Sequence, residues 1–197
     1  MKKEKIIKIL IILIIIVCLF AITISIYYKT NEETQKTEEM KYFLTKKFEL
    51  GCRLIAIDPD VFEIEDTPSI TKISEEGLTF GYYKILDYEE TCNLYFTENA
   101  KKYIDQKGVC LVWIDGLPYL AEGGSGKSVF GKIDFENIKI EDDIIEADAI
   151  MTMIDSDYEF PEYLGKAKSK FRLKKESDFW KIDEIADPDD FEKWKEI

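Results

Sequence analysis

The sequence predicts an α+β protein: an N-terminal transmembrane helix, then helices packed on an antiparallel sheet. Three observations support this fold class. Residues 9–28 form an uncharged apolar run, residues 36–50 carry apolar side chains at helical spacing, and hydrophobic and polar residues alternate from Val109 onward. Helices that precede a series of antiparallel strands are typical of α+β domains.

The apolar run Ile9–Tyr28 is long enough to cross a membrane. Twenty helical residues rising ~1.5 Å each span about 30 Å, the thickness of a bilayer's hydrocarbon core. Four lysines precede the run, which places the N-terminus in the cytoplasm and the bulk of the chain outside the cell. A cleaved signal peptide is the alternative, but the run lacks an Ala-x-Ala end. We therefore expect a single-pass signal anchor in the cell membrane, with residues 1–28 as cytoplasmic stub and anchor.

The length of 197 residues fits one domain with extensions. Residues 29–39 contain no apolar side chain and are expected to be a linker, either a tether or a frayed helix start. Residues 40–186 form the expected extracytoplasmic α+β domain. A helix is expected over about 36–50, beginning in the last residues of the linker and ending near Gly51. Residues 187–197 are expected to be an acidic tail in the form of a short helix.

Helical signals continue between residues 87 and 108. Asp87 is placed to cap one helix and Thr97 a second, which Gly108 ends. The segment Gly77–Leu86 before them indicates a strand or the lead-in to a helix. The side chains expected to point inward are Leu94, Phe96, Tyr103 and Ile104.

The remaining elements are expected to be strands. A turn at Asp115-Gly116 separates two of them, and Glu176-Ser177-Asp178 makes a reversal between the last two. Alternation places Ala147, Ala149 and Met151 on one face of their strand, so one sheet face is expected to be buried. The expected strand segments read CLVWI, LPYLA, NIKIE, EADAIMTMI, AKSKFRL and FWKI.

Charge and composition exclude several function classes. The chain has 27 basic and 40 acidic side chains, a formal net charge of −13, and no histidine. A histidine-based triad, a Cys-His dyad and a histidine-ligated zinc site are therefore impossible, and we expect no enzymatic activity. The acidic surface argues against nucleic acid and favours a cationic partner.

Three cysteines lie beyond the apolar run, at Cys52, Cys92 and Cys110. Their odd number and wide spacing do not form a disulfide framework, and no CxxC pattern exists for metal binding. We interpret them as small buried hydrophobic residues. One disulfide with a leftover thiol is the alternative.

Two further motifs resemble a phosphate-binding loop and a calcium-binding loop, and each departs from its pattern. Ala121–Ser128 (AEGGSGKS) fits a loose phosphate-loop pattern, but the alternating residues after it indicate a strand, where such a loop needs a helix. We therefore expect no nucleotide and no cofactor. The series Asp155-x-Asp157-x-Glu159 has Phe160 where a calcium loop needs glycine, so solvated acid is the main interpretation and an adventitious calcium site the alternative.

Five segments between Tyr82 and Ile185 occur in an order that points to a family. They read YYKILDY, LYFTENAKKYI, PYLAEGGS, IDSDY and ESDFWKI, and AEGGS is the most specific. Over about half of the chain this order resembles the IseA family, secreted inhibitors of cell-wall DL-endopeptidases in Gram-positive bacteria. Four features differ from that family: the expected anchor, Glu122 in place of a loop aspartate, the SGKS continuation of the loop in place of an apolar one, and the acidic DPDD tail.

The resemblance implies a membrane-anchored inhibitor of a peptidoglycan DL-endopeptidase, an NlpC-type cysteine peptidase. An acidic glycine-rich loop would enter the peptidase cleft, and a second acidic turn would make a weaker contact. The alternative is an extracytoplasmic ligand-binding or sensor module with an apolar pocket. The residues implied in partner binding are Glu122, Gly123, Gly124, Ser125, Asp155 and Asp157.

Overall fold

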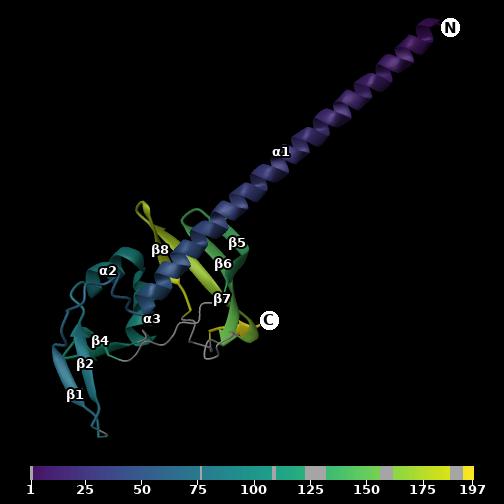
Figure 1. Ribbon diagram of the computed structural model, residues 1–197. Helices are drawn as coiled ribbons and strands as arrows, with labels where there is room; N and C mark the ends of the chain where they lie inside the picture. Colours follow the sequence, from purple (N-terminus) through teal and green to yellow (C-terminus); the bar gives the residue numbers. More distant parts are fainter. Residues whose placement is uncertain (1, 76, 108–109, 123–131, 156–161, 187–192) are drawn as a thin grey trace. The chain divides into compact units, whose positions relative to one another are not determined.

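The protein is an α+β structure with a long N-terminal helix and antiparallel sheets (Figure 1). The computed structural model describes residues 2–75, 77–107, 110–122, 132–155, 162–186 and 193–197; the side chains of residues 2–17, 21, 107, 153–155 and 162–164 are outside the description. The chain divides into two compact units, Met1–Phe43 and Leu44–Ile197.

Helix α1 (Lys2–Ile55) forms all of the described part of the first unit and continues into the second. We expected a transmembrane helix at Ile9–Tyr28, and the structure has a long helix there. Among the described residues, however, no helix combines the length and the apolar character needed to cross a membrane. Residues 29–39 were expected to be a linker and are helical, with ion pairs one turn apart such as Lys36 Nζ–Glu32 Oε1 at 2.7 Å.

Gly51 does not end the first helix, as the sequence suggested. The helix continues to Ile55, and Gly51 is buried where the helix packs on Ile182 and Ile185. A Cβ atom at position 51 would lie 2.6 Å from Ile185 Cδ1 and 2.9 Å from Ile182 Cδ1. This glycine therefore serves a close approach of the helix to its neighbours.

Two antiparallel sheets replace the single expected sheet. The smaller has the order β1-β2-β4-β3, and the larger has the order β5-β6-β7-β8, with β9 pairing with β7. The smaller sheet contains β1 (Ile70–Ile73), β2 (Thr79–Lys84), β3 (Leu111–Ile114) and β4 (Leu117–Ala121). The larger contains β5 (Ile133–Glu141), β6 (Ile144–Asp155), β7 (Glu162–Glu176), β8 (Phe179–Glu184) and β9 (Lys195–Glu196).

The strand and turn predictions are confirmed at several points. Asp115 and Gly116 both have positive φ in the β3–β4 turn, and Ser177 has positive φ in the β7–β8 turn. Ala147, Ala149 and Met151 are buried together on one face of β6, as their alternation predicts.

Helices α2 (Tyr88–Tyr95) and α3 (Glu98–Lys107) follow the smaller sheet's first two strands. Thr97 caps α3 as predicted, because its Oγ1 accepts a hydrogen bond from the Ala100 amide. Asp87 occupies the position before α2, but its carboxylate accepts hydrogen bonds from the Glu63 amide and the Thr91 hydroxyl. Phe96 and Ile104 are buried as expected, whereas Leu94 is 52% exposed.

The core of the larger sheet is aromatic. The Phe48 ring on α1 makes edge contacts with Phe135, Phe171 and Trp194, at centroid distances of 6.2, 5.3 and 6.4 Å. These contacts hold the last turns of α1 against one face of the larger sheet, at Phe135 of β5 and Phe171 of β7. We call this covered side of the larger sheet its inner face and the opposite side its outer face.

The last residues belong to the domain. Trp194 is 6% exposed in the aromatic core, and Lys195–Glu196 pairs with Ala167 and Lys168 of β7. A short helix was expected over 187–197. Within residues 193–197 the structure instead has the two-residue strand β9, because the backbone of β7 beyond β8 offers a pairing edge. Residues 187–192, with Asp187 and Pro188, lie outside the described residues.

Candidate functional site

Glu122 stands directly after β4, at the start of the glycine-rich segment. Its backbone amide donates to Gly81 O at 2.8 Å, and its Oε2 accepts from the Gly81 amide at 2.8 Å. The carboxylate is thus bound to the backbone of β2, while the residue as a whole stays exposed. We call this pair of bonds the Glu122–Gly81 clamp.

Gly81 is required for the clamp. A Cβ atom at position 81 would lie 2.7 Å from Glu122 Oε2 and 3.1 Å from Pro68 Cβ. A larger residue would therefore push the carboxylate away from the strand. The sequence resemblance implied Glu122 in partner binding and did not indicate this bond, because nothing in the sequence brings Gly81, 41 residues earlier, beside it.

The other expected contact residues fall mostly outside the description. Gly123, Gly124, Ser125 and Asp157 lie in undescribed segments. Asp155 is the last residue of β6, and its side chain is not described. The motif residues Gly126, Lys127 and Ser128 also lie outside the described residues, between strands β4 and β5.

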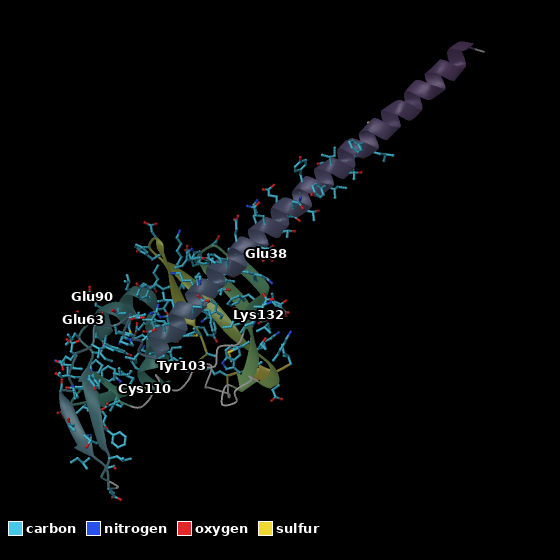
Figure 2. The ribbon with its side chains drawn as sticks, in the orientation of Figure 1. Glu38, Glu63, Glu90, Tyr103, Cys110 and Lys132 are labelled. Atoms are coloured by element: carbon cyan, nitrogen blue, oxygen red, sulfur yellow. The ribbon has the colours of Figure 1, made fainter. Side chains whose placement is uncertain are left out.

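The sheet register nevertheless places the end of the glycine-rich segment and the start of the acidic turn near each other. Lys132, labelled in Figure 2, precedes β5, and its carbonyl accepts a hydrogen bond from the Thr152 amide at 3.0 Å. Strand β6 ends only three residues later, at Asp155. The chain that leaves the glycine-rich segment and the chain that enters the acidic turn therefore meet at one end of the larger sheet.

A charged surface that sequence reasoning missed covers the outer face of the larger sheet. Asp148 on β6 is 4% exposed, and its carboxylate lies 2.8 Å from Lys170 Nζ and 3.0 Å from Lys168 Nζ. Asn137 Nδ2 donates to it at 2.6 Å. Lys170 and Asn137, with help from Lys168, hold the pKa of Asp148 well below its usual range. The signal was present in β7, where five cations recur at every second position: Lys166, Lys168, Lys170, Arg172 and Lys174.

Arg172 anchors the middle of this surface. Its Nε lies 2.6 Å from Asp183 Oδ2 on β8, and the other oxygen of Asp183 accepts from Thr97 Oγ1 at 2.7 Å. Arg172 Nη1 also lies 3.4 Å from Glu184 Oε2. The guanidinium is thus fixed to β8 and, through Asp183, to the start of α3.

Two hollows adjoin the Arg172–Asp183 pair. The larger, about 400 Å³, lies on the outer face, and the smaller, about 260 Å³, lies beside the first turn of α3. The larger is lined by Lys139, Glu141, Ile144, Glu146, Arg172, Lys174 and Asp183. The smaller is lined by Asn99, Ala100, Tyr103, Arg172, Asp183, Glu184, Ile185 and Lys193. Charged side chains of both signs dominate the larger hollow and line part of the smaller one.

Beyond the apolar run, Cys52 and Cys92 are buried, and Cys110 is partly exposed. Burial raises the pKa of the Cys92 thiol to about 12, so this thiol is protonated at neutral pH and is a poor nucleophile. Beside it the Tyr88 hydroxyl donates to Asp105 at 2.7 Å, and Lys101 pairs with the same carboxylate at 3.2 Å. The Tyr88–Asp105 bond joins α2 to α3.

In the part of the chain that the structure describes, no group of three or more cysteine, aspartate or glutamate residues is arranged to hold a metal ion. A scan of the sequence against models of protein families finds no match. A search of curated proteins finds no match either.

Proposed function

We propose that the chain is a membrane-anchored, non-catalytic inhibitor of a peptidoglycan DL-endopeptidase of the NlpC type. Its contact surface comprises the glycine-rich segment that begins at Glu122 and the acidic turn that begins at Asp155. The sequence resemblance to the IseA family is the source of this proposal. The Glu122–Gly81 clamp is the structural observation that supports it most directly.

The clamp supports the proposal because an inhibitory loop must be held in place before it binds. A loop that becomes ordered only on binding loses conformational entropy in that step, and this loss lowers the affinity. A loop that is already held in place avoids the loss. Glu122 bonds the start of the segment to β2, and the Lys132–Thr152 bond attaches its end to β6. Both attachments are made within the described residues and need no partner.

The clamp also refines the role of Glu122. We propose that Glu122 positions the segment through Oε2 and adds negative charge at its base, where a cationic cleft would meet it. Gly123, Gly124 and Ser125 would enter the cleft. Asp155 and Asp157 would act mainly on the association rate.

The alternative function, a sensor module with an apolar pocket, has less support. The two hollows beside the Arg172–Asp183 pair carry charged side chains, and Phe48, Phe135, Phe171 and Trp194 fill the space between the last turns of α1 and the larger sheet. An apolar ligand would have to displace these rings.

The inhibitor proposal is tested with the purified full chain in mild detergent and an NlpC-type endopeptidase acting on isolated cell walls. We expect reversible inhibition that weakens as salt is raised. Glu122→Lys should weaken it by about 2 kcal/mol, roughly thirtyfold, because it breaks the clamp and reverses the charge. The matched control is Glu90→Lys, an exposed glutamate of α2 labelled in Figure 2, which should inhibit like the parent chain.

Two further variants separate positioning from charge. Glu122→Gln keeps an oxygen that accepts from Gly81, so it should lose less inhibition than Glu122→Ala. Gly81→Ala leaves every charge in place but displaces the carboxylate, and should weaken inhibition nearly as much as Glu122→Ala. Unchanged peptidase activity in the presence of the parent chain would refute the inhibitor proposal itself.

We also propose that Ile9–Tyr28 anchors the chain in the cell membrane, with the larger unit on the extracellular side. The absence of charge over these twenty residues and the four preceding lysines support this. The anchored protein should keep its N-terminus and remain with membranes after washing in high salt. A shortened, freely secreted form that begins near Ile26 would contradict the anchor.

A further inference from the structure

The larger hollow on the outer face contains charges of both signs that lack partners. Within the described residues, no ion pair or side-chain hydrogen bond joins Lys139, Glu141 or Lys174 to another group. Their neighbours in the same hollow, Arg172 and Glu146, are paired. Free cations and a free carboxylate thus line one cavity of about 400 Å³.

The sheet register explains why the free charges do not pair with one another. Ile144 on β6 lies opposite Glu141 on β5 and opposite Lys174 on β7. Two strand spacings of ~4.8 Å put the Cα atoms of Glu141 and Lys174 about 10 Å apart. The apolar side chain of Ile144, 41% exposed, lies between them. The order across the sheet is therefore anion, apolar side chain, cation.

The backbone around this row is held in place. The β5–β6 turn is tied to β7, because the Lys175 amide donates to Asp143 O at 2.7 Å. Next to the row, Arg172 is fixed by Asp183, which Thr97 holds in turn. A ligand entering the hollow would therefore meet a preformed backbone and a fixed guanidinium, and would mainly order the exposed side chains of Glu141 and Lys174.

From this arrangement we infer that the hollow binds a linear zwitterion: an amino acid or short peptide whose ammonium and carboxylate are separated by an apolar stretch. The ammonium pairs with Glu141, the carboxylate with Lys174, and the apolar stretch covers Ile144. A simple anion would satisfy Lys174 and leave Glu141 unpaired, and a simple cation would do the reverse. This inference does not depend on the proposed inhibitor function.

The test uses the full chain in mild detergent and three probes of equal length: 6-aminohexanoate, hexanoate and hexylamine. Amide chemical shifts of Ile144 and Lys174, followed by NMR during titration, report binding. We expect 6-aminohexanoate to bind in the millimolar range, because two exposed ion pairs contribute little each, and at least about fivefold more tightly than either single-charge probe.

Three variants locate the site. Glu141→Gln and Lys174→Ala should each weaken 6-aminohexanoate binding at least threefold. Lys166→Ala, which removes an exposed lysine from the same face of the same strand outside the hollow, should leave it unchanged. All three positions are exposed, so thermal unfolding of the variants should match the parent chain.

Three outcomes would overturn the inference. The first is absence of chemical-shift change with 6-aminohexanoate. The second is equally tight binding of hexanoate, which would indicate an anion site alone. The third is equal weakening by Lys166→Ala, which would indicate a general charge effect.

Discussion

The two faces of the larger sheet are built from the same strands and differ in their content of charged side chains. On β6 and β7 the residues of the inner face include Ala149, Phe171 and Leu173, and all three side chains are fully buried. The residues of the outer face include Asp148 and Lys170, which pair with each other. The inner face is stabilised by removal of apolar surface from water, and the outer face by ion pairs that surface solvent partly screens.

Charged side chains without an ion-pair partner among the described residues lie on the outer face of the larger sheet, where they remain in contact with water. On the inner face, Phe48 packs against the buried ring of Phe171 at a centroid distance of 5.3 Å. The outer face buries Asp148 only with three donors around it, and leaves Glu141 and Lys174 exposed at its end. The aromatic core therefore lies on one face, and the groups for which we infer ligand binding lie on the other.

The largest expected effect comes from the inner face. Phe171→Ala removes a ring that contacts both Phe48 and Phe135 and leaves a cavity, so the free energy of unfolding should fall by about 3–5 kcal/mol. Urea denaturation of the full chain measures it. Phe179→Ala, at a position 66% exposed, is the matched control and should change stability by less than about 0.5 kcal/mol. Equal effects would mean that the two positions do not differ in packing.

An intermediate effect is expected at the buried charge of the outer face. Asp148→Asn keeps the shape of the side chain but removes the attraction to Lys168 and Lys170, and should cost about 1–2 kcal/mol. A double-mutant cycle with Lys170→Met, read by urea denaturation, isolates the pair. A coupling energy near zero would show that solvent already screens it.

Acid should weaken the outer face before the inner one. The pKa of Asp148 is lower in the folded chain than in the unfolded chain, so its contribution is complete above the unfolded pKa of about 3.9 and is lost as pH falls toward the folded value. The stability difference between the parent chain and Asp148→Asn should therefore be constant at neutral pH and shrink below about pH 4. Unfolding curves at a series of pH values measure this difference; a difference that grows on acidification would contradict it.

The smallest effect is expected at the edge of the charged surface. Lys166 is exposed and has no ion pair among the described residues, so Lys166→Ala should change the free energy of unfolding by less than about 0.5 kcal/mol. Differential scanning calorimetry against the parent chain measures it. A larger loss would show that the cations of β7 stabilise the sheet as a group.

Patterns of local origin were predictable from the sequence. Alternation placed Ala147, Ala149 and Met151 on a single buried face, and Asp115-Gly116 marked a turn, because both signals depend only on neighbouring residues. Thr97 was recognisable as a helix cap for the same reason. The class α+β follows from the order of these local signals.

Contacts between distant residues were not predictable in this way. Gly51 looked like a helix stop but accommodates Ile182 and Ile185, and the residues after 193 looked helical but pair with β7. Glu122 was implied in partner binding, and its bond to the Gly81 amide was not foreseen. In each case the partner is far away in sequence, and a single chain carries no signal that identifies it.

The sequence by itself determined the acidic character, the absence of histidine chemistry, the apolar N-terminal run and the alternating strands, because composition and period depend on no partner. The tertiary structure decided that the strands divide into two sheets. It also decided that the cations of β7 share the outer face with Asp148 and Asp183, and that Glu141 and Lys174 flank Ile144. The physical reason is register: which residues of neighbouring strands lie opposite each other is set by pairing and packing across the whole domain.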